Sequence, residues 1–191
     1  MADVVLFHHA HGLTPGVESF AERLRAAGHT VTVPDLFEGA TFETVEEGVE
    51  HARRIGFGTV LARGQAAVQD LPATAVYAGF SLGVMPAQLL AQTRPGAVGC
   101  LLLHGCLPPS EFGDGWPDGV AAQIHGMADD PYFAGEDLEA ARALVGQAEQ
   151  AELFLYPGDQ HLFTDSSLAC YVPGAAALAE QRVLKFLAAL G

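Results

Sequence analysis

Short apolar runs alternate with helical patterns along the whole chain, and this alternation constrains the fold more than any other feature of the sequence. The apolar runs predict strands at residues 4–7, 30–33, 73–78, 98–103, 120–124 and 153–156. Apolar residues at helical spacing predict helices at 15–27, 45–70, 84–92, 138–148 and 175–190. Strands that are apolar at every position and separated by amphipathic helices indicate a mostly parallel sheet with helices on both faces. We therefore expect a compact α/β fold with about six strands.

Turn-forming residues mark the ends of several helices. Thr14 and Pro15 suit the start of the first helix, and Gly28 suits its end. In the long second helical stretch, Gly56 and Gly58 are expected to interrupt the helix. These signals separate the predicted helices from the loops that follow the strands.

Length and composition exclude several classes of protein. The 191 residues are 50% hydrophobic and 17% charged, and no repeat or linker divides them, so we expect one globular domain over residues 1–191. Asp and Glu outnumber Lys and Arg by 23 to 9, which gives a formal net charge of −14. Such a surface repels nucleic acid and anionic membranes. No apolar run approaches the ~20 residues of a membrane span.

The start of the chain and its cysteines point to the cytoplasm. The first predicted strand begins close to Met1, without the basic leader or cleavage site of a signal peptide. Cys100, Cys106 and Cys170 form no CxxC pair, so they are expected to be reduced thiols. We therefore expect a cytoplasmic protein; the sequence gives no indication of its oligomeric state.

A G-x-S-x-G motif at residues 79–83 lies between the third predicted strand and the helix that follows it. In this strand–turn–helix context a serine nucleophile is presented at the edge of a sheet. The positions two before and two after Ser81 need glycine, because a Cβ there would make strand and helix collide. Ser81 is therefore the expected nucleophile. The Leu82 N–H, at the start of the helix, is the expected first donor to an oxyanion.

A base and an acid follow later strands, at the edge of the sheet where ligands of parallel sheets bind. His161 lies in a glycine-containing loop after the sixth strand and is the expected general base for Ser81. Asp129 and Asp130 follow the fifth strand, and either could orient the imidazole. We favour Asp130 because the next residue, Pro131, fixes the chain direction where the chain leaves the sheet. The order Ser, Asp, His is that of the α/β-hydrolase triad.

Histidines crowd the loop after the first strand, which reads His8-His9-Ala10-His11-Gly12. In this architecture the loop supplies the second oxyanion donor, which we expect to be the Ala10 N–H or else the His9 N–H. The spacing of His9 and His11 also suits a metal ion, but no third ligand completes a pattern. We expect no metal and no other cofactor. His9 and His11 are instead expected to line the substrate pocket.

With these motifs the chain resembles the dienelactone hydrolase family of α/β-hydrolases over nearly its whole length. The segments that carry the likeness are residues 8–16, 33–37, 79–83, 126–133 and 158–163. The resemblance implies a compact fold without a cap domain. It also implies a nucleophile at Ser81, an acid at Asp129 or Asp130 and a base at His161.

Two departures from the family pattern bear on the substrate. The best-known members carry cysteine as the nucleophile, where this chain has Ser81, and a serine needs fuller help from a base. Those members also carry an arginine four residues after the catalytic histidine, where it grips a substrate carboxylate; here that position is Asp165. Because the chain is also strongly acidic, we expect a neutral ester, lactone or thioester.

Aromatic residues near the motifs are candidates for the walls of the pocket. Phe80 and Phe133 flank the expected triad. Trp116 lies in the loop 107–119, which is too short to form a cap domain. This tryptophan either covers the sheet edge or forms an apolar wall of the pocket. Cys106 is expected to be an inert thiol, because the sequence places no partner histidine for it.

Taken as a sequence, the chain is expected to hydrolyse small carboxylic esters or lactones through an acyl-enzyme on Ser81. Three alternatives remain. The same triad could serve a thioesterase or acyltransferase, the hydrolase scaffold could carry a catalytically inactive binding protein, or the histidines could belong to a metal protein. Product analysis, an ester screen and metal analysis would distinguish them.

Overall fold

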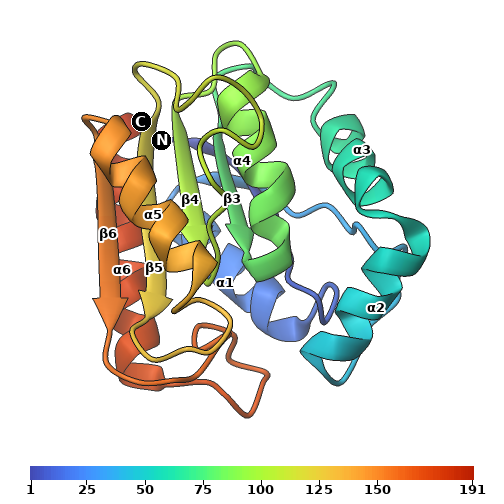
Figure 1. Ribbon diagram of the computed structural model, residues 1–191. Helices are drawn as coiled ribbons and strands as arrows, with labels where there is room; N and C mark the ends of the chain where they lie inside the picture. The colour runs from blue at the N-terminus through green and yellow to red at the C-terminus, as the bar shows by residue number, and fades with distance from the viewer.

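A six-stranded parallel sheet forms the centre of the computed structural model, which describes residues 1–191 (Figure 1). The strands are β1 (Asp3–Phe7), β2 (Thr30–Thr32), β3 (Val76–Phe80), β4 (Gly99–Leu103), β5 (Ala121–Met127) and β6 (Ala151–Tyr156). They lie in the order β2-β1-β3-β4-β5-β6, and every neighbouring pair is parallel. The α/β fold that the sequence predicts is confirmed.

The carboxyl ends of the strands meet at one edge of the sheet, at the lower side of Figure 1. The register aligns Phe80 at the end of β3 with Leu103 of β4. It also aligns Met127 at the end of β5 with Tyr156 of β6. The segments that follow these strands therefore start at the same edge, where ligands of parallel sheets bind.

Helices cover both faces of the sheet. One face carries α1 (Pro15–Ala26) and α6 (Pro173–Leu190). The other face carries α2 (Val45–Ile55), α3 (Phe57–Ala67), α4 (Val84–Thr93) and α5 (Glu136–Gln147). In Figure 1, α4 and α5 lie in front of the sheet and α6 behind it. None of the helices has the length and hydropathy needed to cross a lipid bilayer.

Two apolar layers hold the sheet between these helices, because successive side chains of a strand point to opposite faces. Val5, Tyr77 and Leu102 belong to a cluster of 27 buried residues that includes α2 to α5. Val4 and Leu101 belong to a second cluster, of 15 buried residues, that includes α1 and α6. Both faces of the central strands are thus buried, which explains why the sequence shows continuous apolar runs there.

Two strands, β3 and β5, differ most in extent from the prediction. β3 begins at Val76, later than the predicted residue 73, and β5 continues to Met127, past its predicted end at residue 124. The longer β5 includes a buried histidine that the apolar pattern did not cover. His125 hydrogen-bonds the Tyr156 hydroxyl at 2.8 Å and the Gln123 side chain at 2.9 Å. Paired polar groups can occupy a core strand at little cost, so the strand does not end there.

The long helical stretch is broken once rather than twice. Gly56 separates α2 from α3 with a φ of 89°, a conformation that favours glycine. Gly58 lies inside the first turn of α3, so the predicted interruption at that position is wrong. Between β4 and β5 the chain forms no helix or strand, and the fold has no cap domain.

Candidate active site

The turn after β3 presents Ser81 at the carboxyl edge of the sheet. Ser81 has a φ of 47°, in the left-handed region that is strained for residues other than glycine. A Cβ at Gly79 would overlap the Gly83 carbonyl, and a Cβ at Gly83 would overlap the backbone at the end of β1. The two glycines therefore let strand, turn and helix approach closely, as the motif predicts.

His161 and Asp130 reach the same place from the loops after β6 and β5. The Ser81 Oγ lies 2.8 Å from His161 Nε2, and His161 Nδ1 lies 2.7 Å from Asp130 Oδ2. A carboxylate only accepts hydrogen bonds, so Nδ1–H donates to Asp130, and Nε2 is left to accept the Ser81 hydroxyl proton. Asp130 is fully buried, and its other oxygen accepts the Tyr132 N–H at 2.9 Å, which fixes the carboxylate.

Of the two candidate acids, the structure brings Asp130 to the imidazole and leaves Asp129 exposed. The Asp129 N–H donates to the Gly158 carbonyl at 3.0 Å, which links the loops after β5 and β6. The Asp130 carbonyl accepts the Phe133 and Ala134 N–H groups at 3.0 and 2.7 Å. A tight turn thus follows the acid directly, at the position where Pro131 is expected to fix the direction of the chain.

The loop after β1 carries the expected candidates for the second oxyanion donor. Ala10 is buried, and its N–H donates to no backbone carbonyl of the protein. The Gly12 N–H turns back to the His9 carbonyl at 3.0 Å, and a Cβ at Gly48 of α2 would overlap the Ala10 carbonyl. The loop is therefore tightly held while the Ala10 N–H stays free. Leu82 lies in the turn that leads into α4, where the first N–H groups have no helical partner.

The histidines of this loop join neighbouring segments and do not line the cavity at Ser81, so the predicted pocket role of His9 and His11 is wrong. The His9 Nε2 donates to Asp165 Oδ2 at 2.7 Å, and its Nδ1 accepts the His11 N–H at 3.3 Å. The His11 Nδ1 donates to the Phe42 carbonyl at 2.9 Å. His8 is buried, which lowers its pKa to about 4. No group of three or more His, Cys, Asp or Glu side chains is arranged to hold a metal ion.

Asp165, at the position where the family pattern has an arginine, is buried beside the loop after β1 and does not line the cavity. Its carboxylate accepts hydrogen bonds from His9, from the Thr14 hydroxyl at 2.5 Å, and from the Ser167 N–H and hydroxyl at 2.8 and 2.6 Å. Burial alone would raise the pKa of Asp165, but these bonds hold it well below its usual range. This carboxylate ties the loop after β1 to the loop that carries His161.

A cavity of about 360 Å³ opens beside Ser81 and His161. Its apolar wall comes from α2, α3, α4 and the loops after β4 and β5, with Val45, Val49, Phe57, Met85, Leu107 and Tyr132. The Tyr132 ring centre lies 4.6 Å from that of His161, and the Tyr132 hydroxyl donates to Glu46 on α2. Arg53 of α2 and Asp137 of α5 add two charged side chains to the lining.

Sequence reasoning missed this wall. The periodicity of α2 indicates which of its faces is apolar, but not that this face borders Ser81. Tyr132 had one signal, its position two residues after Asp130. His104, directly after β4, was missed as well: it is fully buried, its Nε2 lies 2.7 Å from the Thr164 hydroxyl, and its ring centre lies 6.0 Å from that of His161.

Two predicted wall residues are packed in the core instead. Phe80 is 2% exposed, and its ring centre lies 5.2 Å from that of Phe20 of α1. Phe133 is fully buried, and a Cβ at Gly126 of β5 would overlap its ring. Neither lines the cavity, so the predicted role of both in substrate binding is wrong. Phe80 points to the α1 face because side chains alternate along β3.

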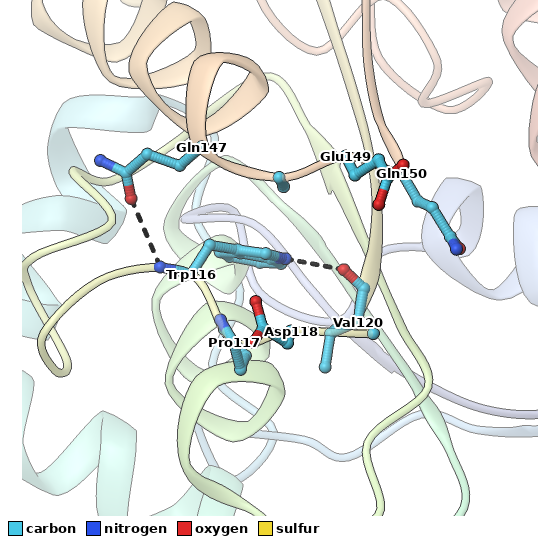
Figure 2. A pocket seen from close by; sticks show the side chains of 9 residues that line it. Trp116, Pro117, Asp118, Val120, Gln147, Glu149 and Gln150 are labelled. Atoms are coloured by element: carbon cyan, nitrogen blue, oxygen red, sulfur yellow. Dashed lines mark hydrogen bonds between the residues drawn. The ribbon is translucent and has the colours of Figure 1, made fainter.

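Trp116 lies at the opposite edge of the sheet, so its predicted place in the substrate pocket is wrong. Figure 2 shows its indole N–H donating to the Val120 carbonyl, at 2.8 Å, just before β5 begins. Its backbone N–H donates to the Gln147 side chain at the end of α5, at 3.4 Å. The residue borders a separate cavity of about 340 Å³. Of the two readings that the sequence allows, covering the sheet edge is correct.

Cys106 has the properties of an inert thiol, as expected. It is buried, and burial raises its pKa to about 12, so the thiol stays protonated at neutral pH. Its N–H donates to the Asp137 carboxylate at 3.1 Å, and its thiol donates weakly to the Leu107 carbonyl at 3.5 Å. The structure brings Ser81, and not a cysteine, to His161.

The parallel sheet, the strained turn and the loops around it define an α/β-hydrolase. The model of the dienelactone hydrolase family matches residues 1–191, so the chain belongs to the dienelactone hydrolase family. In broad terms it is a hydrolase with a small-molecule substrate. Among curated proteins, the sequence comparison finds no match.

Solved structures share the fold at low sequence identity. A dienelactone hydrolase-like promiscuous phosphotriesterase from metagenomic libraries is 21% identical, with a TM-score of 0.81, over 100% of this chain and 87% of that one. A candidate dienelactone hydrolase from Klebsiella pneumoniae is 20% identical, with a TM-score of 0.78, over 98% and 87%. A cold-adapted esterase from an Arctic intertidal metagenomic library is 18% identical, with a TM-score of 0.62, over 95% and 82%. At these identities the likeness establishes the fold alone.

Proposed function

We propose that this protein hydrolyses carboxylic esters or lactones, with Ser81 as nucleophile, His161 as base and Asp130 as the acid that orients it. The observation that carries the proposal is the continuous series of short hydrogen bonds from Ser81 through His161 to Asp130, at 2.8 and 2.7 Å, beside a cavity. A serine hydroxyl needs such a base because it is a weak nucleophile at neutral pH.

The first half of the reaction forms an acyl-enzyme. The Ser81 Oγ attacks the carbonyl carbon while His161 Nε2 takes its proton, and the carbonyl oxygen becomes an oxyanion. The Leu82 and Ala10 N–H groups are proposed to donate to this oxyanion, each worth about 2.7–4 kcal/mol in the transition state. The intermediate then collapses, and the alcohol leaves with the proton that His161 returns.

The second half releases the acid. His161 Nε2 takes a proton from a water molecule, the resulting hydroxide adds to the acyl carbon, and Ser81 leaves with the proton. Asp130 accepts Nδ1–H throughout, so it holds the ring in the tautomer with a free Nε2 and stabilises the imidazolium. None of these steps uses a cofactor.

The finer substrate class follows from the lining of the cavity. Its volume of about 360 Å³ is near the lower end of the range for ligand pockets, and its wall is mainly apolar, which suits a compact acyl group. Asp165 is engaged elsewhere and supplies no cation for a substrate carboxylate. We therefore assign a short-chain ester, lactone or thioester that carries no carboxylate to the site. Three free cysteines favour a reducing, cytoplasmic location.

The test compares Ser81→Ala with the wild type on short-chain nitrophenyl esters. Loss of the nucleophile is expected to lower kcat at least about thousandfold while circular dichroism and the unfolding midpoint stay unchanged. Ser110→Ala, at an exposed serine, is the matched control and should keep full activity. A serine-directed phosphonate should label Ser81 once per chain. Equal rates for Ser81→Ala and the wild type would remove Ser81 from the mechanism.

Two further outcomes would redirect the proposal. Transfer of the acyl group to an added alcohol or thiol in preference to water would make the protein an acyltransferase that uses the same serine. Absence of turnover across a broad panel of esters, lactones and thioesters would favour a binding protein on the hydrolase scaffold.

A further inference from the structure

One charged side chain of the cavity, Asp137, has no role in the reaction described above. It lies in the first turn of α5 and lines the cavity together with Ser81 and His161. A Cβ at Gly105 would lie 3.3 Å from both the Asp137 Oδ2 and the Ser81 carbonyl oxygen. The Asp137 carboxylate and the turn that carries Ser81 therefore both lie beside Gly105.

The Asp137 carboxylate is only half satisfied by the protein. Its Oδ2 accepts the Cys106 N–H at 3.1 Å, and this is its one hydrogen bond from a protein group. Its Oδ1 has no protein partner, and it is not among the buried polar atoms that are sealed from solvent. Because the residue borders the cavity, this free oxygen is open to a bound molecule.

The surroundings of Asp137 leave its charge poorly compensated. Burial raises the pKa of Asp137, and the nearby Asp130 carboxylate acts in the same direction, whereas the Cys106 N–H and His161 act against them. A carboxylate in such a place gains from a cation that brings hydrogen-bond donors or positive charge. The net charge of −14 adds a general attraction for cations and a repulsion of anions.

Arg53 does not reverse this balance. Its side chain is 64% exposed, and its guanidinium lies 3.9 Å from the Glu50 carboxylate on the same helix. The charge of an exposed, paired arginine is strongly screened by water. The more buried charge of the cavity is therefore the negative one.

We propose that Asp137 selects the substrate of this site by binding a positively charged amine group carried by the ester, and by repelling esters that carry a carboxylate. The proposal rests on the ester hydrolysis proposed above and names the class of substrate for that same serine. The apolar wall formed by α2 and Tyr132 would contact the hydrocarbon part of such a molecule.

The experiment uses esters that differ in charge and share their shape. One pair is the nitrophenyl ester of γ-trimethylammoniobutyrate and its uncharged isostere, in which carbon replaces nitrogen. A second pair, acetylcholine and its uncharged carbon isostere, places the cation in the alcohol. The nitrophenyl monoester of glutarate supplies the anion, with its spontaneous hydrolysis subtracted. For at least one pair, the wild-type kcat/KM for the cationic ester should exceed that for its uncharged isostere by about tenfold or more. The anionic glutarate ester should have the lowest kcat/KM of the three nitrophenyl esters.

Asp137→Asn tests whether this residue causes the preference. The carboxamide oxygen can still accept the Cys106 N–H, so the variant removes the charge and keeps the structural hydrogen bond. The cation preference should fall to about onefold to twofold, chiefly through a higher KM for the cationic ester. Glu139→Gln, which removes an exposed charge from the same helix, is the matched control and should keep the wild-type ratio.

Several results would overturn the assignment. Equal kcat/KM for the charged and uncharged partners of both pairs would do so, as would a preference for the glutarate ester that Arg53→Gln abolishes. A cation preference that persists in Asp137→Asn would place the selecting charge elsewhere. In each of these cases the uncharged esters are still hydrolysed. If the proposed hydrolysis itself failed, no ester would be cleaved, so the two failures can be distinguished. Unchanged unfolding midpoints establish that Asp137→Asn is folded.

Discussion

Two buried histidine–aspartate pairs lie in the loops that follow the strands, and only one of them faces a nucleophile. His161 with Asp130 and His9 with Asp165 have the same Nδ1 or Nε2 to carboxylate distance of 2.7 Å, and all four side chains are at most 9% exposed. The other ring nitrogen of His161 lies 2.8 Å from the Ser81 hydroxyl. The other ring nitrogen of His9 accepts a backbone N–H, so it has no lone pair left to act as a base.

A buried histidine–aspartate pair does not by itself define a catalytic centre. A carboxylate fixes the tautomer of a histidine in either place, but chemistry needs the opposite nitrogen to face a reacting group. Asp165 also accepts hydrogen bonds from Thr14 and Ser167, which suits a structural tie between loops.

Removal of the negative charge at Asp130 should have the largest effect on activity. Asp130→Asn is expected to lower kcat about 10⁴-fold, because the amide favours the wrong tautomer of His161. Steady-state kinetics with a short-chain ester measures the loss. Asp129→Asn, at the exposed neighbour, is the control and should stay within about twofold of wild type. The assignment of the acid fails if the two variants behave in the opposite way.

Removal of the charge at Asp165 should act on stability instead. Asp165→Asn leaves four donors facing an amide that cannot accept from all of them, so the free energy of unfolding should fall by about 3–5 kcal/mol. Urea unfolding followed by circular dichroism measures this loss. The kcat of the folded fraction should change less than about tenfold, far less than in Asp130→Asn. A stable but inactive Asp165→Asn would instead put this carboxylate in the reaction.

Buried histidines without a carboxylate hydrogen bond should make the protein less stable in mild acid. Burial lowers the pKa of His8 to about 4 and that of His125 to about 3, from an ordinary value of 6.5. At pH values between 6.5 and these lowered pKa values, the two histidines bind protons in the unfolded chain but not in the folded chain. Stability is therefore fully present above about pH 6.5 and declines below it, by up to about 1.4 kcal/mol per pH unit for each histidine.

Urea unfolding at pH values from 7 down to 5 measures this slope. His125→Gln removes one titrating group and can keep a hydrogen bond to Tyr156. It should lower the dependence of the unfolding free energy on pH by up to about 1.4 kcal/mol per pH unit, the contribution of one proton. A free energy of unfolding that does not change over this range would contradict the prediction.

The smallest effect is expected at the rim of the cavity. Tyr132→Phe keeps the ring beside His161 and removes only the hydrogen bond to the exposed Glu46. The free energy of unfolding should change by less than about 1 kcal/mol, and kcat/KM for a neutral ester by less than about threefold. Tyr132→Ala is the matched comparison, because it removes the ring as well. If Tyr132→Phe cost as much as Tyr132→Ala, the hydroxyl rather than the ring would be the important group.

The sequence predicts the fold and the three proposed catalytic residues because each depends on a local rule. Ser81, Asp130 and His161 each follow a strand, and parallel strands bring such residues to one edge whatever the loops between them do. The choice of Asp130 over Asp129 also had a local cause, the proline that follows it. The central strands are buried on both faces, so their sequences are continuous apolar runs, and such runs predict a parallel sheet.

The walls of the cavity depend on contacts between distant segments, which no local pattern describes. Val49 and Asp137 come from helices on either side of the site, and only the packed structure shows that they share a cavity. His9 and His11 were misassigned because the direction of a loop side chain has no periodicity. Phe80 could have been assigned correctly, since alternation along β3 directs it to the face opposite Tyr77.

Gly48 has a consequence for anyone who wishes to redesign this enzyme. It sits on α2 between Val45 and Val49, two residues of the cavity wall, and its missing side chain makes room for the Ala10 carbonyl. Shorter side chains at its two neighbours would enlarge the space for bulkier molecules. A library that also varies this glycine would push the loop after β1 out of position, and most of its clones would be lost for reasons unrelated to selectivity.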